Sequence, residues 1–326
     1  MKEKCFIING CFGDVLYATP VLKHLSIKYN QKFYLETDKP SIFKNNPYVK
    51  KIFDTSKEEK CNLDNVEFFN CNNYKESPYG GRYLIRTMFM VDFWSTKFGF
   101  TLTPEQKTLE YYPDKEFNYP ESISLPKNYI VISPSITDSC RTWEEAKWEN
   151  LIHQIKSQTD LDIVITGKTI HQDKHSNYTK STWNLSKLDV IDLTDKLNLT
   201  CLWNVVNNSK AFITHNAGGL PFAGTTDTNI ILLGGAIHPH YRLPYRKGSQ
   251  SYKQTYISGD CKIHCQSDIK YNVNDKGDLL KSWWIGGHCF ERKETFECHP
   301  SPDKVFKILM EIINYKKFYK QVKRVG

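Results

Sequence analysis

The stretch FIINGCFGDVLYATPVLKHL, residues 6–25, has the pattern of a strand, a tight turn and a helix. The apolar run 6–8 predicts a short buried strand, and Gly13-Asp14 follows it closely. Beyond Asp14, apolar residues recur at helical spacing, which predicts an amphipathic helix. We therefore expect the Asp14 carboxylate at the start of that helix, at the carboxyl end of the first strand, where open α/β sheets bind ligands.

The length and composition are those of a globular protein with room for two domains. The chain has 326 residues, 40% hydrophobic and 25% charged, and no low-complexity segment. No apolar run approaches ~20 residues, so no membrane span is expected. The first ten residues, MKEKCFIING, are too interrupted for a signal peptide. We therefore expect a cytoplasmic protein, in which ten cysteines argue against a disulfide framework.

Positive charge is concentrated near the end of the chain. The formal net charge is +8, and residues 316–324 read KKFYKQVKR. One interpretation is a solvated helix face. The other is attraction to a phosphate-rich partner, such as anionic lipid headgroups at a membrane surface or a nucleic acid. Charge alone does not choose between them.

Strand and helix patterns alternate in the first half of the chain. Residues 32–38, 47–54 and 65–71 have the pattern of short strands. The aromatic segment 79–100 has a helical period and forms either core or the acceptor side of a cleft. Residues 112–127, YPDKEFNYPESISLPK, contain three prolines and no apolar period, which indicates a linker.

The second half repeats the alternation more clearly. Helices are predicted at 143–155 and 202–206 between apolar strands, which indicates right-handed βαβ units and a parallel sheet. The predicted strands are 129–135, 161–167, 190–197, 211–214 and 229–235. The fold class is therefore α/β, with two doubly wound, Rossmann-like domains facing across a cleft.

The linker sets the predicted domain boundaries. We place the first domain at residues 1–120 and the second at 121–300. A long helix over 301–319 opens with Ser-Pro-Asp, and Pro302 suits its first turn. We expect the last segment, 301–326, to pack back toward the first domain.

Three turns are expected to face the cleft. They are Gly13-Asp14, the segment that runs from Ser133-Pro134-Ser135 to Arg141, and Asn216-Ala217-Gly218-Gly219 after strand 211–214. Glycines at a helix start let backbone N–H groups approach a phosphate, and an arginine can make bidentate phosphate contacts. The three turns predict a site for a diphosphate-containing ligand, with Asp14 as a base opposite it. The alternative for Asp14 is a helix N-cap.

Other phosphate-binding motifs are excluded. The segment from Thr166 to Thr169 ends like a P-loop but lacks its first glycine, and no G-x-G-x-x-G follows the first strand.

Five segments, in order, resemble the bacterial heptosyltransferases of glycosyltransferase family 9. They are residues 13–22, 134–151, 163–168, 191–197 and 211–235. The resemblance implies a GT-B architecture, with the acceptor on the first domain and the donor nucleotide-sugar held mainly by the second. It also implies an inverting, metal-independent transfer from an ADP-heptose-like donor.

The resemblance assigns roles to residues of this chain. Asp14 would be the general base, and Arg141 would neutralise the departing diphosphate. Gly167 and Lys168 would border the nucleoside. The remaining donor-site residues would be Gly13, Ser135, Asn216, Gly218 and Gly219.

The phosphate loop departs from the family pattern. Asn216 replaces the usual acid and Pro221 the usual histidine, and Thr169 stands where an acid is often found. A pocket without these groups can accept a different sugar or nucleotide, so the expected sugar is heptose or a related hexose. His215 is either a partial substitute for the missing histidine or a structural residue.

Four cysteines cluster near the end of the second domain. Cys261 and Cys265 form C-x₃-C, and Cys289 and Cys298 complete four thiols within 38 residues. That inventory suits a tetrahedral zinc or iron site; the alternative is four unrelated thiols. The pattern also resembles that of the autotransporter heptosyltransferases, which bind iron with it. A metal here would be structural, and none is expected to take part in catalysis.

Three functions follow from these observations. The first is a sugar transferase acting on a hydroxyl of a glycan, a lipopolysaccharide or another lipid-linked acceptor, or a protein. The second is a transferase acting on nucleic acid, for example a modified base of phage DNA, which the positive charge permits. The third is a non-catalytic nucleotide-sugar-binding protein, which the altered loop suggests but the presence of Asp14 argues against.

Overall fold

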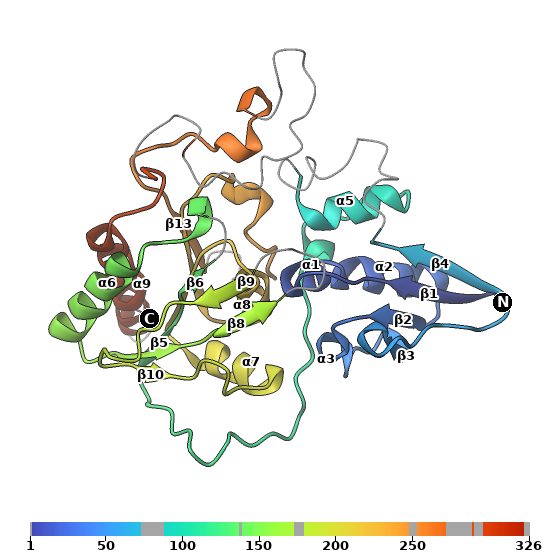
Figure 1. Ribbon diagram of the computed structural model, residues 1–326, viewed down its shortest axis with the longest axis horizontal. Helices are drawn as coiled ribbons and strands as arrows, with labels where there is room; N and C mark the ends of the chain where they lie inside the picture. The colour runs from blue at the N-terminus through green and yellow to red at the C-terminus, as the bar shows by residue number, and fades with distance from the viewer. Residues whose placement is uncertain are drawn as a thin grey trace.

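The protein consists of two α/β units that lie side by side in a computed structural model (Figure 1). The structure describes residues 2–72, 88–136, 139–172, 179–247, 253–271, 289 and 296–322. The first unit contains the blue and cyan elements of Figure 1, and the second contains the green to red ones.

The first unit is built on a parallel sheet of four strands in the order β3-β2-β1-β4. Its strands are β1 (Glu3–Ile7), β2 (Phe33–Thr37), β3 (Val49–Asp54) and β4 (Val66–Asn70). Its helices are α1 (Phe12–Tyr17), α2 (Thr19–Tyr29), α3 (Pro40–Phe43) and α5 (Met90–Lys97). The strands predicted at 32–38, 47–54 and 65–71 are confirmed.

The helix predicted after the first strand is divided in two. The helix α1 ends at Tyr17, and α2 begins at Thr19 with Pro20 in its first turn. Proline cannot donate a backbone hydrogen bond to the preceding turn, which accounts for the division. The apolar face runs through both helices, because Val15, Leu16, Val21, Leu22 and Leu25 are all fully buried.

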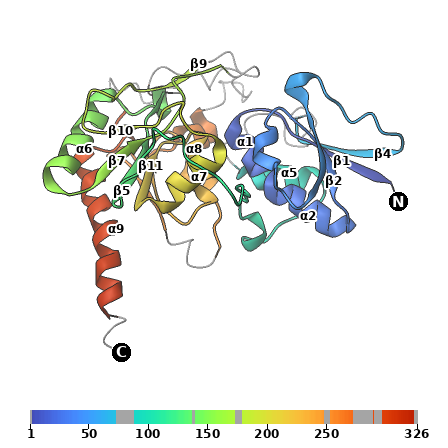
Figure 2. The same cartoon turned by 90° about the horizontal axis from the view of Figure 1, so that it is seen from below.

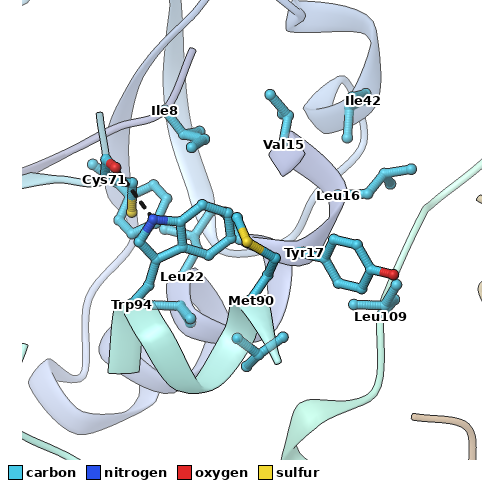
Figure 3. Close-up of a cluster of buried hydrophobic side chains, with 14 of the residues drawn as sticks. Ile8, Val15, Leu16, Tyr17, Leu22, Ile42, Cys71, Met90, Trp94 and Leu109 are labelled. Atoms are coloured by element: carbon cyan, nitrogen blue, oxygen red, sulfur yellow. Dashed lines mark hydrogen bonds between the residues drawn. The ribbon is translucent and has the colours of Figure 1, made fainter. Parts of the chain in front are cut away.

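The centre of the first core is Trp94 on α5 (Figure 3). Its indole is fully buried near Leu22 and Met90, and Nε1 donates a hydrogen bond to the carbonyl oxygen of Cys71 at 3.2 Å. The described part of segment 79–100, residues 88–100, therefore forms core. Residues 79–87 lie outside the described residues.

Replacing Trp94 with alanine is expected to lower the free energy of unfolding by about 3–5 kcal/mol, because a large ring leaves a cavity that the sheet cannot fill. Trp94→Phe keeps a ring and loses the hydrogen bond to Cys71, so we expect a smaller cost of about 1–2 kcal/mol. Urea unfolding followed by far-ultraviolet circular dichroism, which reports backbone structure, measures the free energy of unfolding of both variants. Equal and small effects would show that this ring does not organise the core.

The second unit is built on a parallel sheet of six strands in the order β10-β7-β5-β11-β12-β13. Numbered within the unit, this is the order 3-2-1-4-5-6 of a Rossmann fold. The strands are β5 (Tyr129–Ser133), β7 (Asp162–Ile165), β10 (Ile191–Asp192), β11 (Ala211–Thr214), β12 (Asn229–Leu233) and β13 (Gln254–Ile257). Its helices are α6 (Glu145–Gln158), α7 (Leu199–Asn208), α8 (Gly219–Gly224) and α9 (Pro302–Val322).

Two features of the second unit were not predicted from the sequence. The edge strand β13 extends the parallel sheet, and β6 (Ser135–Ile136), β8 (Ile170–Gln172) and β9 (Thr179–Thr182) form a small antiparallel sheet in the order β6-β9-β8. The antiparallel sheet connects the loop after β5 with the loop after β7.

The chain passes from the first core to the second within the proline-containing linker. Tyr111 still belongs to the core of the first unit, whereas Tyr119 packs against the second sheet. In Figure 1 this segment descends from the first unit as an irregular coil and passes beneath the second unit.

The helix α9 packs on the second unit. Val305 and Leu309 join the apolar core that Trp148 and Ile155 of α6 also enter. Figure 2 shows α9 beside α6, on the side away from the first unit. The described part of segment 301–326 therefore does not pack back toward the first domain as expected, because its apolar stripe covers α6. No helix in the part of the chain that the structure describes has the length and apolar character to cross a membrane.

Candidate active site

The predicted loops meet where the strand order of the second sheet reverses. The strands β5 and β11 are neighbours in the sheet, although a βαβ excursion to β7 and β10 separates them in the chain. The crevice at such a reversal is the usual ligand site of an open α/β sheet. The loop that carries Ser135 and Arg141 follows β5, and the loop that carries Asn216, Gly218 and Gly219 follows β11.

Contacts join these two loops. Arg141 Nη1 donates a hydrogen bond to the backbone oxygen of Asn216 at 3.3 Å. The hydroxyls of Ser133 and Ser135 are hydrogen-bonded at 3.3 Å, and a Cβ atom on Gly219 would lie 3.4 Å from Ser133 Oγ. Gly218 caps the start of α8 and Gly219 is its first residue, so the glycine pair lies at a helix start as predicted.

The start of α1 packs directly on the glycine loop. A Cβ atom on Gly13 would lie 3.2 Å from Pro221 Cγ and 3.4 Å from Gly218 Cα. The rings of Phe12 and Phe222 pack nearby at an interplanar angle of 53°, with centroids 5.5 Å apart. A residue without a side chain at position 13 is therefore what lets the two units come this close. Pro221 contributes to this contact through its ring.

Asp14 lies in the first turn of α1 and is half-buried. The N-cap of α1 is Cys11, so the alternative interpretation of Asp14 as the N-cap is wrong. Its carboxylate is close enough to Arg242 and Tyr17 to act on both. Burial raises the pKa of Tyr17, the charge of Arg242 opposes this, and the charge of Asp14 adds to it. Burial lowers the pKa of Arg242 to about 10, and Tyr17 and then Asp14 offset part of that effect.

A pocket opens beside Asn216 and Arg141. Its empty space, including the part open to solvent, is about 290 Å³, and residues 232–237 form one wall. The polar side chains that line it belong to Arg141, His215, Asn216, Arg242 and Tyr256. None of these side chains carries negative charge, and all five can donate hydrogen bonds. The pocket is therefore suited to an anion.

His215 is held as a neutral hydrogen-bond donor. Its side chain is 1% exposed, and Nε2 accepts a hydrogen bond from the backbone N–H of Trp143 at 2.9 Å. Burial, followed by the neighbouring His299, lowers the pKa of His215 well below its usual value. The single ring proton of the neutral form is therefore assigned to Nδ1. Among the described residues, Nδ1 has no hydrogen-bond partner.

Arg242 and Tyr256 are pocket residues that the sequence analysis missed. Arg242 follows β12, the neighbour of β11, so the rule that selected Arg141 after β5 could have selected it. Tyr256 lies on β13, the edge strand that the sequence pattern did not predict.

Two predicted donor residues lie away from this pocket. Lys168 is exposed, and its Nζ lies 3.4 Å from the carboxylate of Asp195. The backbone oxygen of Gly167 accepts a hydrogen bond from Asp195 N–H at 3.1 Å, and Asp195 in turn accepts one from the backbone of Thr169. Gly167 also lies against Thr182, the strand partner of Ser135. These residues lie together in the loop after β7 and do not line the pocket.

All ten cysteines, each among the residues that the structure describes, are free thiols. Burial raises the pKa values of Cys265 and Cys298 to about 12, and the charges of other cysteines in the predicted set of four add to this effect. The set therefore lies close enough for its members to interact. Within the described ranges, however, no group of three or more His, Cys, Asp or Glu side chains could hold a metal ion.

The cysteine-rich segment contacts the loop that carries Arg141. Gln266 Nε2 donates to Cys140 Sγ at 3.1 Å, and the backbone N–H of Gln266 donates to the oxygen of Ala236, in the pocket wall, at 2.9 Å. His299 Nε2 lies 3.1 Å from the backbone oxygen of Cys140. The segment thus supports two walls of the pocket.

Two Rossmann-like units with a site at their junction define the GT-B class of glycosyltransferases. The profile of glycosyltransferase family 9 (heptosyltransferase) matches residues 46–268. The chain therefore belongs to glycosyltransferase family 9 and is a glycosyltransferase.

Solved structures share this fold at low sequence identity. The iron-containing dodecameric glycosyltransferase TibC from enterotoxigenic E. coli H10407 is 15% identical, with a TM-score of 0.63 over 98% of this chain and 77% of TibC. A family 9 glycosyltransferase from Veillonella parvula is 13% identical, with a TM-score of 0.60 over 96% and 98% of the two chains. The E. coli ADP-heptose lipopolysaccharide heptosyltransferase II is 12% identical, with a TM-score of 0.57 over 97% and 99%. A search of curated protein sequences finds no match.

Proposed function

We propose that the protein is an inverting, metal-independent glycosyltransferase that moves heptose or a related hexose from a nucleoside-diphosphate donor to an acceptor hydroxyl. The observation that carries the proposal is the pocket of hydrogen-bond donors after β11 and β12, with the half-buried Asp14 carboxylate contributed by the other unit. An anion site next to a carboxylate suits a reaction that releases a diphosphate and takes up a proton.

In the proposed reaction Asp14 accepts the proton of the acceptor hydroxyl. The acceptor oxygen forms a bond to the anomeric carbon of the sugar as the bond from that carbon to the diphosphate oxygen breaks. The bonding electron pair leaves with the diphosphate. Arg141 and the backbone N–H groups at Gly218 and Gly219 would stabilise the negative charge that develops there. Attack from the face opposite the leaving group inverts the anomeric configuration.

The donor is proposed from the relatives. One TibC structure contains ADP-D-beta-D-heptose, and an E. coli WaaC structure contains ADP. An adenosine diphosphate sugar is therefore the first donor to test. The acceptor would be a glycan, a lipopolysaccharide or a protein, and the ten free cysteines agree with a cytoplasmic location.

The test is a calorimetric screen of ADP-heptose, ADP-glucose, UDP-glucose and GDP-mannose, followed by transfer assays with chelator present. The acceptors are lipopolysaccharide cores, a peptide library and single- and double-stranded DNA containing hydroxymethylated bases. Transfer with inversion to any of them supports the reaction, and the acceptor that works decides between the glycan, protein and nucleic acid hypotheses. Binding without transfer would show a nucleotide-sugar-binding protein, and no binding would overturn the proposal.

We also propose a structural zinc or iron ion at the four cysteines 261, 265, 289 and 298. Cys261→Ser is expected to remove the metal and to lower the melting temperature by ~4 °C or more, because metal affinity contributes to folding. Cys201→Ser, which removes a thiol on α7, is the control and should leave the metal content unchanged. Elemental analysis that finds no stoichiometric metal in the wild-type protein would end this proposal.

A further inference from the structure

Arg242 is a buried arginine in the wall of the pocket. Its side chain is 6% exposed, and Nη1 donates to the backbone oxygen of the adjacent Tyr241 at 2.8 Å. Within the described ranges no carboxylate lies within 4 Å of its guanidinium group. A buried guanidinium without an ion-pair partner is costly, so its position calls for an explanation.

The position of Arg242 is held by the other unit. Tyr17, at the end of α1, is buried with 5% of its surface exposed, and its hydroxyl donates a hydrogen bond to the backbone oxygen of Arg242 at 2.6 Å. Phe89 packs edge-on against the Tyr17 ring and also against Tyr245, which lies beyond Arg242 in the chain. The loop that carries Arg242 is therefore joined to the first unit at Tyr17, which lies three residues after Asp14.

Two charged groups act on the Arg242 guanidinium. Arg141 lies close enough to repel it, and Asp14 attracts it. The same pocket contains two buried nitrogens without a hydrogen-bond partner among the described residues, His215 Nδ1 and Asn216 Nδ2. An anion in the pocket would supply Arg242 with an ion-pair partner and these two nitrogens with an acceptor.

We propose that Arg242 binds the diphosphate of the donor together with Arg141, and that the Tyr17 hydrogen bond positions it for this contact. The inference rests on the proposed function and adds a second guanidinium to it. It also makes diphosphate affinity depend on the contact between the two units.

Arg246 shows what a purely structural buried arginine looks like in this chain. It is 7% exposed, and its guanidinium donates to the backbone oxygens of Thr226, Thr228 and Lys253. Burial lowers its pKa to about 10, as for Arg242. Arg246 does not line the pocket, so it is a matched control of the same type and burial.

The test compares binding of inorganic pyrophosphate, ADP and AMP by calorimetry. We expect Arg242→Gln to weaken the binding of pyrophosphate and ADP by roughly 10- to 100-fold, because it removes charged hydrogen bonds to the second phosphate. The binding of AMP should weaken by less than about threefold. Arg242→Lys should recover part of the affinity. Arg246→Gln should lower the melting temperature and leave the ratio of ADP to AMP affinity unchanged.

If Arg242→Gln does not fold, Tyr17→Phe tests the same contact, because it removes only the hydroxyl. Tyr17→Phe should weaken the binding of pyrophosphate by roughly threefold or more and leave the binding of AMP unchanged. A wild-type protein that binds pyrophosphate or ADP, with variants at 242 and 17 that bind them equally well, would overturn this inference alone. A wild-type protein that binds neither pyrophosphate nor any nucleoside diphosphate would overturn the proposed function.

Discussion

Replacing Asp14 with asparagine is expected to lower the rate of sugar transfer by roughly a hundred- to ten-thousand-fold while donor affinity stays within about threefold. Asparagine has the size of aspartate and similar hydrogen-bonding capacity, but it cannot accept the proton of the acceptor hydroxyl. Asp14 is half-buried at the junction of the units and acts on Arg242, so its loss should affect proton transfer more than folding. Single-turnover kinetics and donor calorimetry measure the two quantities separately.

Asp92 provides the matched control. It is also an acid in the first turn of a helix, α5, and it forms an ion pair with Lys107 at 2.7 Å. A helix-dipole contribution would be similar at the two positions, about 0.3–1 kcal/mol, so Asp92→Asn should leave turnover unchanged. Wild-type turnover in Asp14→Asn, or an equal loss in both variants, would contradict the role of Asp14 as the base.

Replacing Arg141 with methionine is expected to lower kcat by roughly 100- to 1000-fold. Methionine preserves much of the side-chain volume and removes the positive charge that would face the departing diphosphate. The effect should appear mainly in kcat, because negative charge on the leaving group increases as the glycosidic bond breaks. Steady-state kinetics with donor and acceptor varied in turn measure it.

Arg141→Lys separates charge from geometry. Lysine retains the charge but cannot make bidentate contacts, nor reproduce the fixed fork that now donates to the oxygen of Asn216. We expect it to recover about one-tenth of the wild-type kcat or less. A loss confined to KM in both variants would place Arg141 in donor binding alone.

Much of the fold is predictable because its central strands are continuous apolar runs. All five residues of β5 and of β12 are buried, so their sequences show both the strand and its burial on two faces. The edge strand β13 has only Ile257 fully buried, which leaves no such pattern. The packing of α9 was mispredicted for a related reason: an amphipathic pattern shows that one face is apolar, but not which surface covers it.

The site residues also differ in how well the sequence predicts them. Gly13, Asp14, Arg141 and the glycine pair lie in loops or turns that follow strands, so position in the chain was enough to select them. Arg242 also follows a strand, β12, but its backbone oxygen is held by Tyr17 of α1, more than 200 residues earlier in the chain. Contacts of that range arise from the docking of the two units and leave no local pattern in the sequence.

The packing of Gly13 on Pro221 has a consequence for building hybrid enzymes. A side chain at position 13 would have to displace the Pro221 ring or the Gly218 backbone, neither of which can rotate aside. A chimera that takes its first domain from another member of the family should therefore keep a glycine opposite Pro221. A large residue there would push the two halves apart, even if both halves fold correctly.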